Sequence, residues 1–236
     1  MRIVLVVLSL VVLATLAPKG GSCGTETTKG GGVGVFMFGW NGFDVDELRS
    51  KLRESGFEGL EKKDFTYGGG GYGLVGERIL LGGEGYGFEQ VVFSDSVKAT
   101  LGGGYGFFDV GYVVLSRRGI QVYPMIGIGG GGMDLRLAAR NGTPQFDEVL
   151  ENPRREATLS VGGLLLQCAL GVDYFLSLGG NERAQGGLIF GLRLGYTFAS
   201  SKGDWSMKDA DVIGGPDARI TGPYIHFAIG GAGFNR

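Results

Sequence analysis

The side chains that could carry chemistry in this chain are few, and they lie far apart in the sequence. His226 is the only histidine, and an Asp or a Glu could orient it as a general base. Ser116, Ser160 and Ser200 are the candidate nucleophiles, but none of them lies in the Gly-x-Ser-x-Gly turn of a hydrolase. We therefore expect a buried hydrogen-bonded cluster, and keep a lipid-modifying hydrolase or acyltransferase as the less favoured alternative. The candidate cluster residues are Glu84, Asp109, Gln167, Asp173, Arg193 and His226.

Cofactor and metal sites are not expected from the motifs. Gly127–Gly132 matches the Gly-x-Gly-x-x-Gly pattern, and the following segment MDLRLAAR could be helical. However, Asp147, the acidic residue about twenty positions on, lies in a polar segment instead of ending a second strand, so a dinucleotide site is disfavoured. Cys23 and Cys168 belong to no Cys-x-x-Cys or Cys/His cluster, which argues against structural zinc.

Eight segments rich in β-branched and aromatic residues are available to position the polar residues. Several are longer than the roughly five or six residues of a typical soluble strand. The expected strands are 33–40, 64–76, 78–89, 97–116, 120–138, 157–177, 185–199 and 220–234. The fold is therefore predicted to be all-β.

Large apolar residues alternate with small or polar residues in these segments. In 187–198, Leu188, Phe190 and Leu194 share one face, while Gly187 and Arg193 share the other. The same alternation occurs in 164–174, 108–114 and 225–230. It places Asp109, Gln167, Asp173 and His226 on the small-residue face with Arg193, and Glu84 in GGEGYG is expected to point inward too. Six large residues per strand would overfill an eight-stranded interior, so we expect the apolar faces to contact lipid. We expect Glu84 to pair with Arg78 or a loop lysine.

The connections between the segments alternate in length. Short turns near Glu77, Arg117–Gly119 and 178–184 alternate with loops at 41–63, 90–96, 139–156 and 200–219. This pattern predicts an eight-stranded antiparallel up-and-down transmembrane β-barrel with both termini on the side of the tight turns. A soluble barrel with its apolar faces turned inward is the alternative, binding a small apolar ligand.

One short helix is expected in the first long loop. Asp44 is a candidate N-cap with Glu47 three residues later, and Gly56 is a candidate C-terminal stop. Leu48 and Leu52 form a modest apolar stripe, which favours packing against the loops or over the barrel mouth.

Glycine dominates the composition, with 49 of 236 residues, yet 43% of the chain is hydrophobic. Collagen is excluded because no three-residue period exists, and a disordered linker is excluded because the chain is too apolar. A net charge of −2 without basic runs argues against nucleic acid as a partner. Tracts such as GGGGYG, GGEGYG and GGGYG predict close sheet coiling with aromatic cover from the next strand.

The chain begins with a segment typical of an export signal. Residues 1–17 carry Arg2 followed by an apolar run that is shorter than the ~20 residues of a spanning helix. Ala14, Ala17 and Ser22 are the candidate cleavage positions, and residues 18–32 are expected to form a flexible glycine-rich lead-in to a barrel domain at 33–236. Lipidation of Cys23 is a less favoured possibility than an unmodified thiol.

The signal, alternating loops and glycine/aromatic strands of 33–236 resemble small eight-stranded bacterial outer-membrane β-barrel proteins, including a glycine-rich, little-characterised group. The resemblance implies a place in the outer membrane, contact with its lipid, and a lumen too narrow for a general porin. It implies no activity, so we expect a non-enzymatic structural or surface-binding role, with an extracellular ligand or protein at the long loops. The candidate residues of the interfacial aromatic belts are Trp40, Tyr112, Tyr123, Tyr174 and Tyr196.

Overall fold

The computed structural model describes residues 30–76, 78–139, 156–180, 184–200, 203–208 and 210–235. The export signal, Cys23, Asp147 and nearly all of the 139–156 loop lie outside the described residues. Within these ranges, no helix has the length and apolar character needed to cross a membrane.

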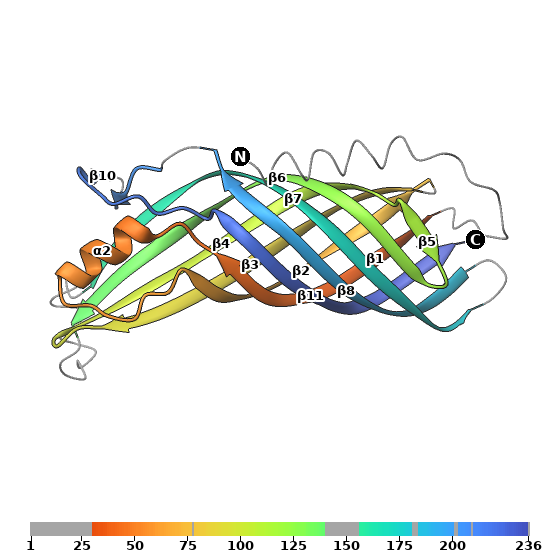
Figure 1. The fold of residues 1–236 in the computed structure, drawn as a ribbon, viewed down its shortest axis with the longest axis horizontal. Coiled ribbons are helices and arrows are strands. Elements are labelled where there is room, and N and C mark those ends of the chain that lie inside the picture. The colour runs from red at the N-terminus through yellow and green to blue at the C-terminus, as the bar shows by residue number, and fades with distance from the viewer. Residues whose placement is uncertain are drawn as a thin grey trace.

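Eight antiparallel strands close into a ring, as predicted (Figure 1). Sequential neighbours pair in order, and the first strand pairs with the last, from Gly30 opposite Asn235 to Asn41 opposite Tyr224. The barrel strands are β1 (Gly30–Gly42), β2 (Lys63–Val75), β3 (Ile79–Phe93), β4 (Val97–Tyr112), β6 (Ile120–Ala139), β7 (Glu156–Gly180), β8 (Ala184–Ala199) and β11 (Gly222–Asn235). In the middle of the barrel every strand is therefore paired on both sides, which satisfies its backbone groups without water. At the loop end, β3 continues past Gly87, where its pairing with β2 ends, and β7 begins before Leu165, where its pairing with β8 starts.

Three local differences from the expected strands are clear. β1 already begins at Gly30, inside the expected lead-in. The segment MDLRLAAR is not helical, because β6 continues through it to Ala139 and pairs on both sides. The segment 97–116 is two strands: β4 ends at Tyr112, and the short β5 (Leu115–Arg117) forms a separate hairpin with β6.

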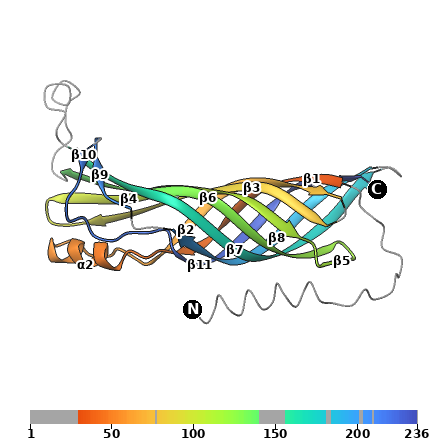
Figure 2. The same ribbon diagram turned by 90° about the horizontal axis from the view of Figure 1, so that it is seen from above.

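The two ends of the barrel differ (Figure 2). The β2–β3 turn, the β5–β6 turn, β5 and the C-terminal end of β11 lie at one end, hereafter the turn end. The loop expected at 90–96 is instead a tight turn at the other end, because β3 continues to Phe93 and β4 begins at Val97. Helix α2 (Asp46–Glu54) and the short strands β9 (Ser206–Met207) and β10 (Ala210–Asp211) lie at the other, the loop end. The start of β1 at Gly30 and the end of β11 at Asn235 pair with each other, so both lie at the turn end, as predicted from the loop lengths.

Helix α2 is confirmed, but its predicted N-terminal cap is wrong. The helix begins at Asp46 after Val45, without a side-chain cap hydrogen bond. The backbone of Asp44 instead pairs with Arg219 at 3.0 and 2.9 Å, and a Glu47 carboxylate oxygen accepts from the backbone N–H of Asp217. Gly56 ends the helix as expected, with a φ of +82° that suits glycine.

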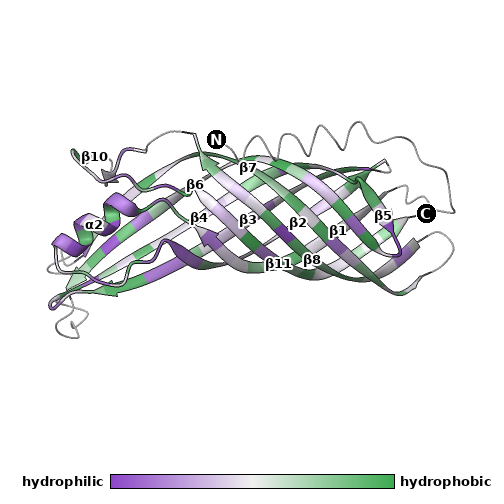
Figure 3. Cartoon of the chain, in the orientation of Figure 1, coloured by the Kyte–Doolittle hydropathy of each residue, from purple (hydrophilic) through white to green (hydrophobic). Residues whose placement is uncertain are grey.

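The alternation of side chains has the predicted sense. Leu188, Phe190 and Leu194 are exposed on the outside of β8, while Ile189 and Arg193 between them are buried. β4, β7 and β11 repeat this pattern, and the hydropathy colours alternate along the strands (Figure 3). The barrel thus has an apolar exterior and a lumen that contains its polar side chains.

Candidate functional site

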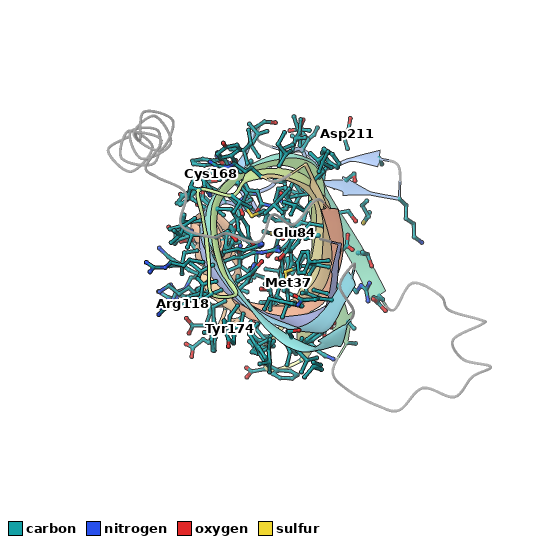
Figure 4. All side chains as sticks on the ribbon, turned by 90° about the vertical axis from the view of Figure 1, so that its right-hand side faces the viewer. Met37, Glu84, Arg118, Cys168, Tyr174 and Asp211 are labelled. Carbon is teal, nitrogen blue, oxygen red and sulfur yellow. The ribbon has the colours of Figure 1, made fainter. Side chains whose placement is uncertain are left out.

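All six polar residues singled out in the sequence lie inside the barrel. They are at most 7% exposed, although the strands that carry them are distributed around the ring. Viewed along the barrel from the turn end, Glu84 and Met37 lie within the ring of strands (Figure 4). We call the following residues, which contact one another here, the lumen network: Met37, Thr66, Tyr72, Glu84, Tyr86, Asp109, Tyr123, Gln167, Asp173, Arg193, Tyr224 and His226.

Arg193 forms the central ion pair of the lumen network. Its guanidinium Nη1 contacts the Glu84 carboxylate across the barrel, and both side chains are nearly inaccessible to solvent. The same nitrogen lies 3.2 Å from the Met37 sulfur, and the guanidinium carbon lies 5.8 Å from the centre of the Tyr72 ring. A buried carboxylate requires such a partner, because an unpaired charge in this environment is strongly destabilising. The expected partners Arg78 and a loop lysine are therefore wrong; Arg78 lies 3.4 Å from the Tyr112 hydroxyl on the exposed side.

Gln167 connects two carboxylates to a tyrosine. Its amide nitrogen donates to Glu84 Oε1 at 2.8 Å and to Asp109 Oδ1 at 2.7 Å. Its amide oxygen accepts from the Tyr224 hydroxyl at 2.8 Å. One neutral side chain thus uses both donors and its acceptor to join β3, β4, β7 and β11.

Asp173 is held by two tyrosine hydroxyls. Tyr123 donates to its Oδ2 at 2.8 Å, and Tyr72 donates to the same oxygen. Hydrogen bonds from hydroxyls to a carboxylate are stronger than neutral ones, so Asp173 is stabilised without a second cation in contact.

His226 is enclosed by aromatic rings and not by carboxylates. Its Nε2 lies 3.0 Å from the Thr66 hydroxyl oxygen, and its ring stacks on Tyr86 and Tyr224 at 4.3 and 4.6 Å between centroids. Its Nδ1 has no hydrogen-bond partner among the described residues. Among the described residues, no carboxylate hydrogen-bonds to this imidazole, as one does in a Ser-His-Asp triad.

Glycines opposite the tyrosines make the room for this network. Five tyrosines point into the lumen, and each has a glycine as register partner on a neighbouring strand: Tyr72–Gly82, Tyr86–Gly68, Tyr105–Gly131, Tyr123–Gly171 and Tyr224–Gly195. A β-carbon added at Gly171 would overlap the Tyr123 ring, and one at Gly195 would overlap the Tyr224 ring. The predicted aromatic cover of bare backbone is therefore the packing principle of the lumen.

The sequence interpretation missed the tyrosine half of the network. Tyr123 is 2% exposed, so its placement in an interfacial belt is wrong. The alternation in β6 could have shown this. Tyr123 shares its face with Met125 and Gly127, whereas the exposed Ile126 and Ile128 lie on the opposite face. Trp40, Tyr112 and Tyr174 do lie on the outside, as expected.

The lumen leaves little free space beside these groups. A cavity lined by Tyr72, Asp109, Tyr123 and Arg193, among others, has a volume of about 20 Å³, which is enough for one water molecule. Among the described residues, no group of three or more His, Cys, Asp or Glu side chains is arranged to hold a metal ion. Cys168 is a free thiol on the outward-facing side of β7.

The loop end of the barrel is filled by an apolar cluster. Leu48 and Leu52 of α2 pack with Phe88 from the barrel and with Trp205 and Ile220 from the last long loop. Lys51 of α2 donates to the Gly214 carbonyl of the last long loop at 2.8 Å. Within that loop, Trp205 Nε1 donates to the Pro216 carbonyl at 2.6 Å. The helix therefore packs over the barrel mouth, as the apolar stripe predicted.

No protein-family model and no curated protein sequence matches this chain. Solved structures of outer-membrane proteins are similar to it in part. The attachment invasion locus protein Ail of Yersinia pestis has 8% sequence identity and a TM-score of 0.42, covering 89% of this chain and 99% of Ail. OprG of Pseudomonas aeruginosa has 11% identity and a TM-score of 0.40 over 90% and 98% of the two chains. The outer-membrane protease OmpT of Escherichia coli has 7% identity and a TM-score of 0.35 over 91% and 99%.

Proposed function

We propose that this chain is an integral outer-membrane β-barrel with a structural or surface-binding role, a closed lumen and no catalytic activity. The observation that carries the proposal is the reversed distribution of polarity. Charged and amide side chains lie inside the barrel, whereas exposed Leu, Ile, Phe and Val residues lie on the outer faces of its strands. Water favours the opposite arrangement, and a lipid bilayer favours this one.

A soluble barrel that binds a small apolar ligand is less well supported. Such a protein would need an apolar pocket of a few hundred cubic ångströms inside the barrel. Here the lumen contains an ion pair, amide and tyrosine side chains beside a cavity of only about 20 Å³. The same crowding supports a barrel that does not conduct.

A hydrolase is also less well supported. His226 contacts Thr66, Tyr86 and Tyr224, and all four side chains lie inside the lumen. A substrate would have to displace the loop-end cluster or the lumen network to reach the imidazole.

The loop end offers the surface for a binding role. The outer side of α2 borders two hollows of about 420 and 450 Å³, and Arg49 and Arg53 line both. The first and the last long loop are fixed to each other by the Lys51–Gly214 and Asp44–Arg219 contacts, so these two loops form one continuous surface.

Fractionation and gel mobility test the membrane assignment. We expect the full chain in the outer-membrane fraction, with an electrophoretic mobility that changes on boiling, because a closed barrel resists detergent until it is heated. In planar bilayers we expect no steady conductance from the purified protein. A monodisperse mature chain in buffer without detergent would contradict the proposal.

Cysteine labelling tests the orientation. In a Cys23→Ser/Cys168→Ser background, Lys208→Cys places a thiol in an exposed loop-end turn, and Arg118→Cys places one in an exposed turn at the other end. A membrane-impermeant maleimide should label the first in intact cells and the second only after the outer membrane is permeabilised. The reverse result would contradict the orientation.

A further inference from the structure

An apolar groove runs along the outer surface of β7 and β8 near the turn end of the barrel. It has a volume of about 320 Å³ and is lined by Ile120, Val172, Tyr174, Phe190, Gly191 and Leu192. Tyr174 pairs with Phe190, and Val172 pairs with Leu192 one step closer to the middle of the barrel. The groove therefore extends from the turn end toward the centre of the apolar exterior.

Two arginines lie at the outer end of this groove. Arg117 is the register partner of Ile120, a lining residue, and Arg118 follows it in the exposed turn that leads back into β6. The Gly119 carbonyl accepts from the backbone N–H of Phe175 at 2.8 Å, which holds the turn against β7. A β-carbon at Gly119 would lie 3.5 Å from the Tyr174 ring, and in the end-on view Arg118 and Tyr174 lie on the same side of the barrel (Figure 4).

Neither arginine has a carboxylate partner in the part of the chain that the structure describes. By contrast, Arg78 at the same end of the barrel lies over the Tyr112 ring, 6.0 Å from its centre. A pair of unneutralised guanidinium groups beside an apolar groove is complementary to an anionic head group with an acyl chain.

We propose that the groove and the Arg117–Arg118 turn bind one anionic glycerophospholipid of the inner leaflet. One acyl chain lies in the groove against Tyr174, Phe190 and Leu192, and the phosphate lies against the two guanidinium groups. The geometry gives the direction: the charged end is at the turn end, and the apolar end points to the middle of the barrel. The proposal rests on the proposed membrane function, which places the turn end at the periplasmic leaflet.

Native mass spectrometry of the detergent-purified full chain with added dioleoyl phosphatidylglycerol tests the site. We expect one retained lipid on the wild-type chain and a roughly thirtyfold weaker retention in Arg117→Gln/Arg118→Gln, because two cationic contacts are lost. Arg78→Gln removes the same charge at the same end outside the groove, and it should retain the lipid as the wild-type chain does. Val172→Phe fills the groove without changing the charge and should also weaken retention.

The proposal would be overturned if Arg117→Gln/Arg118→Gln retained the lipid as well as the wild-type chain does. It would also be overturned if Arg78→Gln lost as much lipid as the double variant. Tighter retention of lipid A than of phosphatidylglycerol at this site would overturn the assignment to the inner leaflet. The heat-dependent mobility of each variant reports the intact barrel separately. A variant that loses the lipid but keeps the normal mobility shift has an intact barrel and a defect in the groove. A wild-type chain that shows no mobility shift, or is not found in the outer membrane, would contradict the proposed function.

Discussion

Glycines on the two faces of the barrel wall differ in what surrounds them. On the lumen side, an added β-carbon at Gly129 or Gly171 would overlap a neighbouring backbone or the Tyr123 ring. On the outer side of β1 and β11, no heavy atom lies within 4 Å of the β-carbon position at Gly32, Gly34, Gly231 or Gly233. The lumen glycines are thus required by packing, while these outer glycines are not required by any contact within the barrel.

This difference indicates that stability depends mainly on the inner face. The lumen network connects all eight barrel strands through side chains, whereas an outer residue such as Phe108 faces the surroundings of the barrel. Paired substitutions, one on each face, can test this, with the free energy of unfolding measured by urea titration of the refolded barrel in detergent.

The largest effect is expected at the central ion pair. Arg193→Met leaves the Glu84 carboxylate buried without its cation, which should lower the free energy of unfolding by about 3–5 kcal/mol. Arg136→Met, an exposed arginine of β6, is the matched control and should change it by less than about 0.5 kcal/mol. Equal losses in the two variants would contradict a stabilising role for the lumen network.

A smaller effect is expected at a lumen glycine. Gly171→Ala forces the Tyr123 ring out of its position, although the ring is fixed by the hydrogen bond from its hydroxyl to Asp173. Overpacking of this kind costs about 1–3 kcal/mol. If Gly171→Ala/Tyr123→Leu were no more stable than Gly171→Ala alone, steric conflict with the ring would not be the cause.

Loss of one hydroxyl at the same contact should be milder. Tyr123→Phe removes the hydrogen bond to Asp173 Oδ2 but leaves the one from Tyr72, so we expect a loss of about 1–1.5 kcal/mol. Tyr112→Phe on the outer face should be close to neutral. A larger effect of Tyr112→Phe than of Tyr123→Phe would reverse the comparison between the faces.

The smallest effect is expected at an outer glycine, and its sign should be opposite. Gly34→Ala meets no neighbouring atom and removes the backbone freedom of glycine in the unfolded chain. We therefore expect a gain of about 0.5–1 kcal/mol in the free energy of unfolding. A loss as large as that of Gly171→Ala would show that outer and inner glycines are equally constrained.

Much of this fold could be predicted from residue alternation. The strand faces around Leu188–Phe198 and Leu164–Tyr174 were assigned correctly, because a strand's side chains alternate with a fixed period of two. The helix was predicted but its start was not, because Asp44 pairs with Arg219, a residue 175 positions away, instead of capping the helix. Local capping patterns carry no information about such a distant partner.

The sequence by itself determined the face of most polar lumen side chains: Asp109, Gln167, Asp173, Arg193 and His226 follow from the alternation within their strands. Only the tertiary structure decided which of them meet. Glu84 pairs with Arg193 and not with Arg78, and each lumen tyrosine lies opposite a glycine. Both results follow from barrel closure, because it fixes the register and stagger between strands. The periodicity within one strand predicts whether a side chain points into the lumen or outward. The position of that side chain along the barrel axis, relative to side chains across the lumen, depends on all eight strand pairings at once.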